Sequence, residues 1–202
     1  MGLFGPSQNE VWSQLSEEIN GKFVKGSFFK GSRVELSHHP WTIYLDTYSV
    51  STGKTTVIYT RMRAPFILSD NLYFKVYKKG IFSEMGKFFG MQDIEIGIQD
   101  FDEDYIIKGN KEDIIKKLFS NSRIRNLIKI QPRISLEIKE GEGIFGSGFK
   151  QNEGELYFQA DRVITDIDLL KNLFELFGEM LGELNRLGCI GSEAPMVRLY
   201  KD

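Results

Sequence analysis

The sequence predicts an α+β fold in which a mostly antiparallel, strongly twisted sheet is covered by helices. Residues 22–163 consist largely of segments where apolar and polar residues alternate, a pattern typical of half-buried strands. Residues 166–187 instead carry a wide apolar stripe at helical spacing. The 16 Phe, 8 Tyr and 2 Trp among 202 residues also favour a sheet-rich fold, because half-buried sheet surfaces favour aromatic side chains.

Length and composition restrict the class of protein. A chain of 202 residues is expected to form a single domain, residues 1–202. The net charge of −2 gives no general basic field, so we expect no nucleic acid among the partners. The single cysteine, Cys189, allows no intramolecular disulfide, which fits a reducing compartment and predicts a cytoplasmic location. No apolar run approaches the roughly 20 residues of a membrane-spanning helix, so no transmembrane segment is expected.

The first element in chain order is an N-terminal helix over about 8–20. Ser7 and Glu10 have the spacing of a capping box, in which each residue bonds the backbone amide of the other. Asn20 and Gly21 then predict the end of the helix. The apolar stripe that follows the cap consists of Val11, Trp12, Leu15 and Ile19.

A hairpin is predicted in the first half of the sheet. Residues 41–51 alternate between an apolar face and a polar face that includes Asp46. A turn at 51–54 leads to a second strand over 55–66. Because proline cannot donate to a strand ladder, Pro65 limits how deep in the sheet this second strand can lie.

The most strongly patterned stretch is 93–129, where the sheet is expected to give way to helices. Alternating isoleucines predict a strand over 94–98, followed by an acidic corner and a second strand. Asn110 is predicted to cap a helix whose apolar side includes Ile114, Ile115, Leu118 and Phe119. Asn121 and Ser122 cap a further short helix. Another short helix is predicted immediately upstream, over 81–89.

The last third of the chain is predicted to contain a glycine-rich hairpin and the longest helix. Gly-dense residues 140–154 separate a strand over 134–138 from a strand over 155–163. Thr165 and Asp166 cap the helix over 166–187, and Gly188 ends it. Within this helix Gly178 and Gly182 permit close packing, either inside the molecule or between subunits, so a homo-oligomer is a further hypothesis.

An acidic corner at 100–104 is a candidate metal site. Asp100, Asp102 and Asp104 offer the carboxylate oxygens that Ca²⁺ and Mg²⁺ prefer. Joined by His38 or His39, they would support a metal-assisted hydrolase. The alternative interpretation is a solvated turn that protects a sheet edge from pairing with another chain. No cofactor motif is present in the required structural context, so no cofactor is expected.

A basic region over 116–129 is a candidate partner-binding surface. It could contact an anionic partner, or it could be a solvated helix face that balances the acidic corner. The candidate ligand- or partner-binding residues are Arg61, Arg63, Lys116, Lys117, Arg123 and Arg125.

Three segments, YTRMRAPF (59–66), GIFSEMGKFFGMQDIEIG (80–97) and FDEDYIIKGNKEDIIKKLF (101–119), together resemble a family of prokaryotic proteins of unknown function. That family pairs a TR-x-R-x-P strand with a G-x-QDI-x-x-G block and a following FD-x-x-Y-x-I-K-G-N block. The resemblance covers about residues 20–140. It implies a coherent fold and brings no activity or catalytic residue to this chain.

These observations favour a non-catalytic cytoplasmic binding or scaffold domain with an unknown protein or small-molecule partner. Two alternatives stay open. One is the metal-assisted hydrolase that uses the acidic corner, and the other is a carrier that holds an apolar ligand between sheet and helix.

Overall fold

The order of strands and helices along the chain agrees with the sequence patterns, with local exceptions. The computed structural model describes residues 6–27, 31–51, 53–80, 92–140, 152–197 and 199–200. The strands are β1 (Lys22–Val24), β2 (Arg33–His38), β3 (Trp41–Ser51), β4 (Thr56–Ile67), β5 (Phe74–Lys78), β6 (Gln92–Asp93), β7 (Tyr105–Gly109), β8 (Ser135–Glu140) and β9 (Glu153–Ala160). The helices are α1 (Gln8–Glu18), α2 (Gln99–Asp104), α3 (Glu112–Ser120), α4 (Ser122–Ile130) and α5 (Ile167–Arg186).

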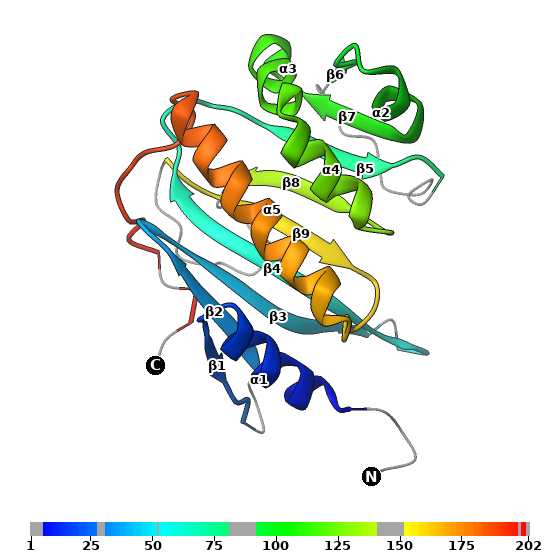
Figure 1. Ribbon diagram of the computed structural model, residues 1–202, viewed down its shortest axis with the longest axis vertical. Helices are drawn as coiled ribbons and strands as arrows, with labels where there is room; N and C mark the ends of the chain where they lie inside the picture. The colour runs from blue at the N-terminus through cyan, green and yellow to red at the C-terminus, as the bar shows by residue number, and fades with distance from the viewer. Residues whose placement is uncertain are drawn as a thin grey trace.

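The described strands form a nine-stranded antiparallel sheet in the order β1-β2-β3-β4-β9-β8-β5-β7-β6. Helices α1, α5 and α4 lie side by side across one face of this sheet (Figure 1). The predicted α+β class, with an antiparallel sheet and a long C-terminal helix, is therefore confirmed.

The predicted hairpin of β3 and β4 is present, with Asp46 opposite Arg61 in the antiparallel register. Pro65 lies in β4, which is a central strand of the sheet and not an edge. The ladder nevertheless accommodates it, because β3 pairs with β4 only as far as Arg63. Beyond that point β4 pairs with β9 alone, so Pro65 occupies a locally one-sided position.

Helix α5 covers the centre of the sheet. The Asp166 side chain accepts a hydrogen bond from the Leu169 amide at 2.9 Å, as expected for its N-cap. Gly188 ends the helix with a φ of 74°, a conformation that suits glycine. Its buried side consists of Leu170, Leu173, Phe174, Leu176, Phe177, Met180, Leu181 and Leu184. Among the residues described, no helix has the length and apolar character that crossing a membrane requires.

Helix α1 packs beside α5 at one side of the sheet. The Ser7–Glu10 capping box forms as predicted, with the Ser7 amide donating to Glu10 Oε2 at 2.7 Å. The Trp12 ring is fully buried, and its Nε1 donates to the Ile164 carbonyl at 3.1 Å. This contact ties α1 to the segment that leads into α5.

The predicted strand over 94–98 is wrong. Among these residues and their neighbours, the structure has only the short strand β6, followed by an irregular segment and then α2, where an acidic corner was expected. The Asp102 carboxylate accepts hydrogen bonds from three consecutive backbone amides, those of Ile96, Gly97 and Ile98, at 2.9–3.0 Å. These bonds fold the segment back over α2, which an extended strand could not do.

Asn110 does not cap α3, which corrects a second prediction. Its side-chain oxygen accepts a hydrogen bond from the Tyr73 amide at 2.9 Å, and its side-chain nitrogen donates to the Asn71 carbonyl at 2.6 Å. The side chain therefore joins two loops, and Lys111 occupies the N-cap position without a side-chain bond. The predicted helix over 81–89 and most of the glycine-rich segment over 140–154 lie outside the described residues.

Replacing Trp12 tests the attachment of α1. Trp12→Ala should lower the free energy of unfolding by about 3–5 kcal/mol, because a buried aromatic ring is lost. Trp12→Phe should cost about 1–3 kcal/mol, since it leaves the Ile164 carbonyl without its donor. Urea denaturation measures both values. Ile58→Ala, at a side chain that is 48% exposed, is the control and should change stability by less than about 0.5 kcal/mol. A loss below about 1 kcal/mol for Trp12→Ala would contradict this packing.

Candidate functional site

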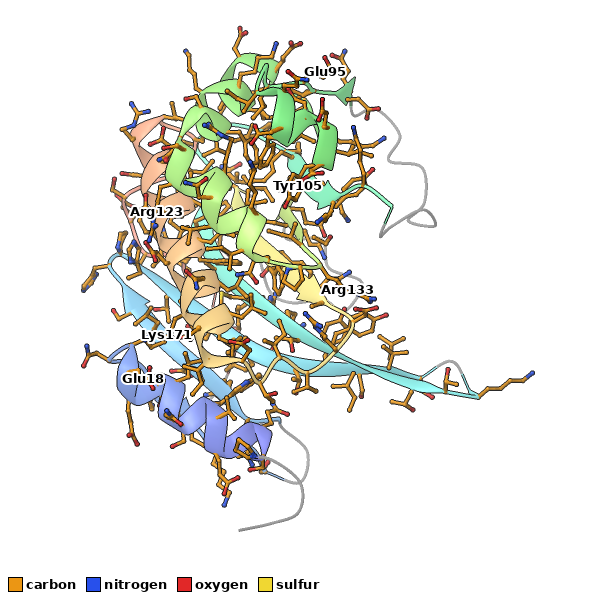
Figure 2. The ribbon with its side chains drawn as sticks, turned by 45° about the vertical axis from the view of Figure 1, so that its right-hand side comes forward. Glu18, Glu95, Tyr105, Arg123, Arg133 and Lys171 are labelled. Carbon is orange, nitrogen blue, oxygen red and sulfur yellow. The ribbon has the colours of Figure 1, made fainter. Side chains whose placement is uncertain are left out.

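A groove of about 740 Å³ runs along the side of α5 that faces β2 and the end of α1. Near one end of it, Lys171 of α5 forms an ion pair with Glu18 of α1 at 3.0 Å (Figure 2). The lining residues are Ile19, Leu36, His38, Asp168, Lys171, Asn172, Phe174, Glu175, Gly178, Glu179, Gly182, Glu183 and Arg186. Because the lining extends from Asp168 to Arg186, the groove follows α5 for about 27 Å at the usual helical rise.

The groove has apolar side chains and two glycines along its walls. Ile19 and Leu36 are partly exposed there, and both pack against the hydrophobic core. The His38 ring lies close to Gly178. A Cβ atom added to Gly178 would lie 3.1 Å from the His38 ring. Apart from the neighbouring residues and the nearby backbone of α5 itself, no described heavy atom lies within 4 Å of the corresponding position on Gly182. A glycine inside a helix lowers stability by roughly 1 kcal/mol relative to alanine. At Gly182 the missing side chain leaves one wall of the groove open.

Acidic side chains predominate along the rim of the groove. The lining includes Asp168, Glu175, Glu179 and Glu183 against only Lys171 and Arg186. Glu175 pairs with Arg123 of α4, and Glu183 accepts a hydrogen bond from Arg186 at 3.0 Å. Within the described ranges Glu179 has no ion-pair partner, so the rim keeps a negative character.

The opposite face of the sheet is polar and densely bonded. Its residues alternate along the strands with the apolar residues beneath the helices. Arg61 donates to the two Asp46 carboxylate oxygens at 2.8 and 2.5 Å. Arg63 donates to Glu155 at 2.6 Å. We call this set the polar face, and it consists of Arg33, Glu35, Tyr44, Asp46, Tyr48, Arg61, Arg63, Lys75, Glu137, Glu155, Tyr157 and Gln159.

Burial on the polar face changes the titration of its side chains. Desolvation lowers the pKa of the fully buried Lys75 amine, although Glu137 opposes this shift from 3.3 Å. Burial raises the pKa of the Tyr157 phenol, and its contact with Tyr48 acts in the same direction. The Tyr157 phenol therefore keeps its proton well above neutral pH, and it donates a hydrogen bond to Gln159 Oε1 at 3.1 Å.

The six predicted ligand- or partner-binding residues lie on two sides of the molecule. Arg61 and Arg63 belong to the polar face, where each is held by a carboxylate. The other four belong to α3 and α4. Lys116 pairs with Glu112 at 2.6 Å, and Lys117 is exposed. Arg123 pairs with Glu175.

Arg125 has a structural contact that the sequence did not indicate. Its Nη1 donates to the Phe119 and Ser120 carbonyls at 2.6 and 2.7 Å. These carbonyls end α3, where a cation is favourable. Ligand or partner binding by the six residues stays a prediction.

The acidic corner is distributed over several local contacts. Asp100 pairs with Lys129, and Asp102 accepts the three backbone amides described above. In the part of the chain that the structure describes, His, Cys, Asp and Glu form no group of three or more that could hold a metal ion. His38 lines the groove beside α5, while α2 lies next to β7, six places further along the sheet order. The structure thus does not bring His38 to the acidic corner.

Sequence reasoning noted the pair Gly178 and Gly182 but did not identify the groove. The signal was a pair of glycines one turn apart in an otherwise strong helix. The sequence did not indicate that β2 and the end of α1 lie beside these two glycines. The polar-face partners Asp46 and Glu155 were likewise missed, because each pairing depends on strand register.

Comparisons with known proteins give one structural similarity. No protein-family model matches the chain, and no curated protein matches it. A crystal structure of the mycobacterial trehalose monomycolate transport factor A, TtfA, aligns with 95% of this chain and 98% of that chain. The alignment has a TM-score of 0.48 and 8% sequence identity.

Breaking one buried ion pair tests whether the polar face is a closed network. Arg63→Met should cost about 3–5 kcal/mol of unfolding free energy, because it leaves Glu155 buried without its partner. Adding Glu155→Leu should recover most of that loss. The control is Arg133→Met, whose partner Asp161 is half exposed, and it should cost no more than about 1 kcal/mol. Equal losses for Arg63→Met and Arg133→Met would contradict the network.

Metal titration tests the acidic corner. Calorimetric titration of Mg²⁺ and Ca²⁺ into the wild-type chain and an Asp102→Ala, Asp104→Ala variant should show binding only in the wild type if the metal hypothesis holds. Absence of heat in both proteins would end the metal-assisted hydrolase hypothesis. Loss of stability in the variant is expected in either case, since Asp102 holds three amides.

Proposed function

We propose that this chain is a non-catalytic binding domain and that the groove beside α5 is its ligand site. The supporting observation is the shape of the groove, which is long, open and partly apolar. Its volume of about 740 Å³ lies within the range of about 300–1,000 Å³ that small-molecule sites occupy. The proposed ligand is elongated, with an apolar body that covers Leu36 and Phe174.

The groove suits a ligand better than the polar face does. A ligand that bound through Arg61 or Arg63 would have to displace Asp46 or Glu155 from these arginines, and both ion pairs are short and buried. In the groove, the partly exposed Ile19 and Leu36 gain by being covered, at about 25 cal/mol for each Å² of apolar surface removed from water. This form of the function matches the carrier hypothesis, in which the ligand lies between sheet and helix.

The acidic rim adds a preference to the proposed ligand. Glu179 and Asp168 repel an anionic headgroup and attract a cationic one. A neutral or cationic amphipathic molecule is therefore favoured over a fatty-acid carboxylate. We place the function in the cytoplasm, where the buried, single Cys189 is compatible with reducing conditions.

Filling the groove from Gly182 tests the proposed function. Nile red, a neutral apolar dye, should become fluorescent with the wild-type chain and show at least about tenfold weaker binding to Gly182→Leu, because a side chain would occupy the open wall. The variant should fold well, since no described atom outside the neighbouring residues and the nearby α5 backbone lies within 4 Å of the new Cβ atom, and leucine is the better helix former by about 0.8 kcal/mol.

Lys117→Leu is the matched control for this test. It adds the same side chain to an exposed position of α3, outside the groove. Equal dye binding by the wild type, Gly182→Leu and Lys117→Leu would contradict the proposal. If only Gly182→Leu binds the dye more weakly, mass spectrometry of organic extracts from the purified wild-type chain would identify the natural ligand, which should be absent from Gly182→Leu.

A further inference from the structure

The C-terminal segment leaves α5 and crosses onto the polar face. The Gly191 amide donates to the Ile67 carbonyl at 2.8 Å, and Leu68 and Ile190 form an isolated bridge at the end of β4. Further along, the Met196 and Val197 amides both donate to Glu153 Oε1, at 2.8 and 3.2 Å. The segment thus passes from the helix-covered side to the side that carries Arg61.

Tyr200 of this segment lies in a seat formed by β2 and β3. Its hydroxyl donates to Asp46 Oδ2. The Arg33 guanidinium lies 4.5 Å from the centre of its ring, and the Tyr44 ring lies 5.3 Å away at 50°. Burial raises the pKa of the Tyr200 phenol, and the Asp46 carboxylate raises it further, so the hydroxyl keeps its proton. A phenol is the group that matches an acceptor, a cation and an aromatic edge together.

The seat is built by contacts that do not involve Tyr200. Asp46 is fixed by the two hydrogen bonds from Arg61. Arg33 is fixed by Glu35 at 2.6 Å. Arg61 lies opposite Asp46 on the neighbouring strand, and Glu35 lies two residues from Arg33 on the same strand. Because neither pair includes Tyr200, the seat is expected to keep its shape when Tyr200 leaves.

The segment itself buries little of its surface. None of the described residues between Gly191 and Tyr200 is buried, and the Met196 side chain is 72% exposed. A segment with little buried apolar surface opens at much lower free energy than the whole fold. A preformed site whose bound segment opens at low free energy can exchange that segment for another.

We propose that the polar face carries a recognition site for a tyrosine-bearing chain segment, filled by Tyr200 of the same chain. This site is separate from the groove and does not depend on the proposed function. Being tethered gives the tail an effective concentration on the order of mM, so it excludes free competitors until it is released or altered.

A vacated seat should accept the same segment in trans. The receptor is the full-length Tyr200→Ala chain, and the probe is a fluorescein-labelled peptide with the sequence of residues 190–202. Fluorescence anisotropy should show at least about tenfold tighter binding to Tyr200→Ala than to the wild type, since the tethered competitor is gone. A peptide with alanine at the tyrosine should not bind, and a phenylalanine peptide should bind about tenfold more weakly, because it lacks the bond to Asp46.

Amide exchange provides an independent measurement within the chain. The Met196 and Val197 amides should exchange at least about tenfold faster in Tyr200→Ala, while Glu193→Ala, an exposed tail control, leaves them unchanged. Equal peptide binding by wild type and Tyr200→Ala, no binding by a folded Tyr200→Ala, or unchanged exchange would each overturn the proposal. Gly182→Leu in the Tyr200→Ala background should bind the peptide normally, which separates this site from the groove.

Discussion

The pairing of β4 with β9 is the constraint on which both surfaces depend. It joins residues almost a hundred positions apart and places Met62 opposite Phe158, beneath the helices. The same register places Arg63 opposite Tyr157, on the polar face. Because side chains alternate with period two, a slip of one residue would bring polar side chains such as Arg63 under α5. One register therefore determines where the core, the groove and the ionic network lie.

The two faces of the sheet bury their side chains in different ways. Beneath the helices, apolar side chains exclude water, and α5 leaves its glycine wall uncovered beside β2. On the polar face, Arg61, Arg63 and Lys75 each pair with a carboxylate on a neighbouring strand, which avoids the cost of an unpaired buried charge. The first solution leaves open space for a ligand, and the second gives a rigid surface on which a chain segment can be seated.

Local sequence patterns predicted the elements better than they predicted the contacts. The capping box at Ser7 and the helix α5 were predicted correctly, because caps and apolar stripes depend on residues close together in the sequence. The cap at Asn110 and the strand over 94–98 were predicted wrongly, because the Asn110 and Asp102 side chains bond backbone groups that the apolar pattern does not register. The groove was not predicted, since it arises where three separate elements meet.

Mapping a bound ligand onto the structure tests the two-sided account most directly. Backbone amide shifts of the wild-type chain would be recorded by NMR during titration with Nile red. Shifts concentrated at Leu36, Gly178 and Gly182, with Arg61 and Arg63 unmoved, are the expected result. Shifts concentrated on Arg61 and Arg63 instead would contradict the assignment of ligand binding to the groove.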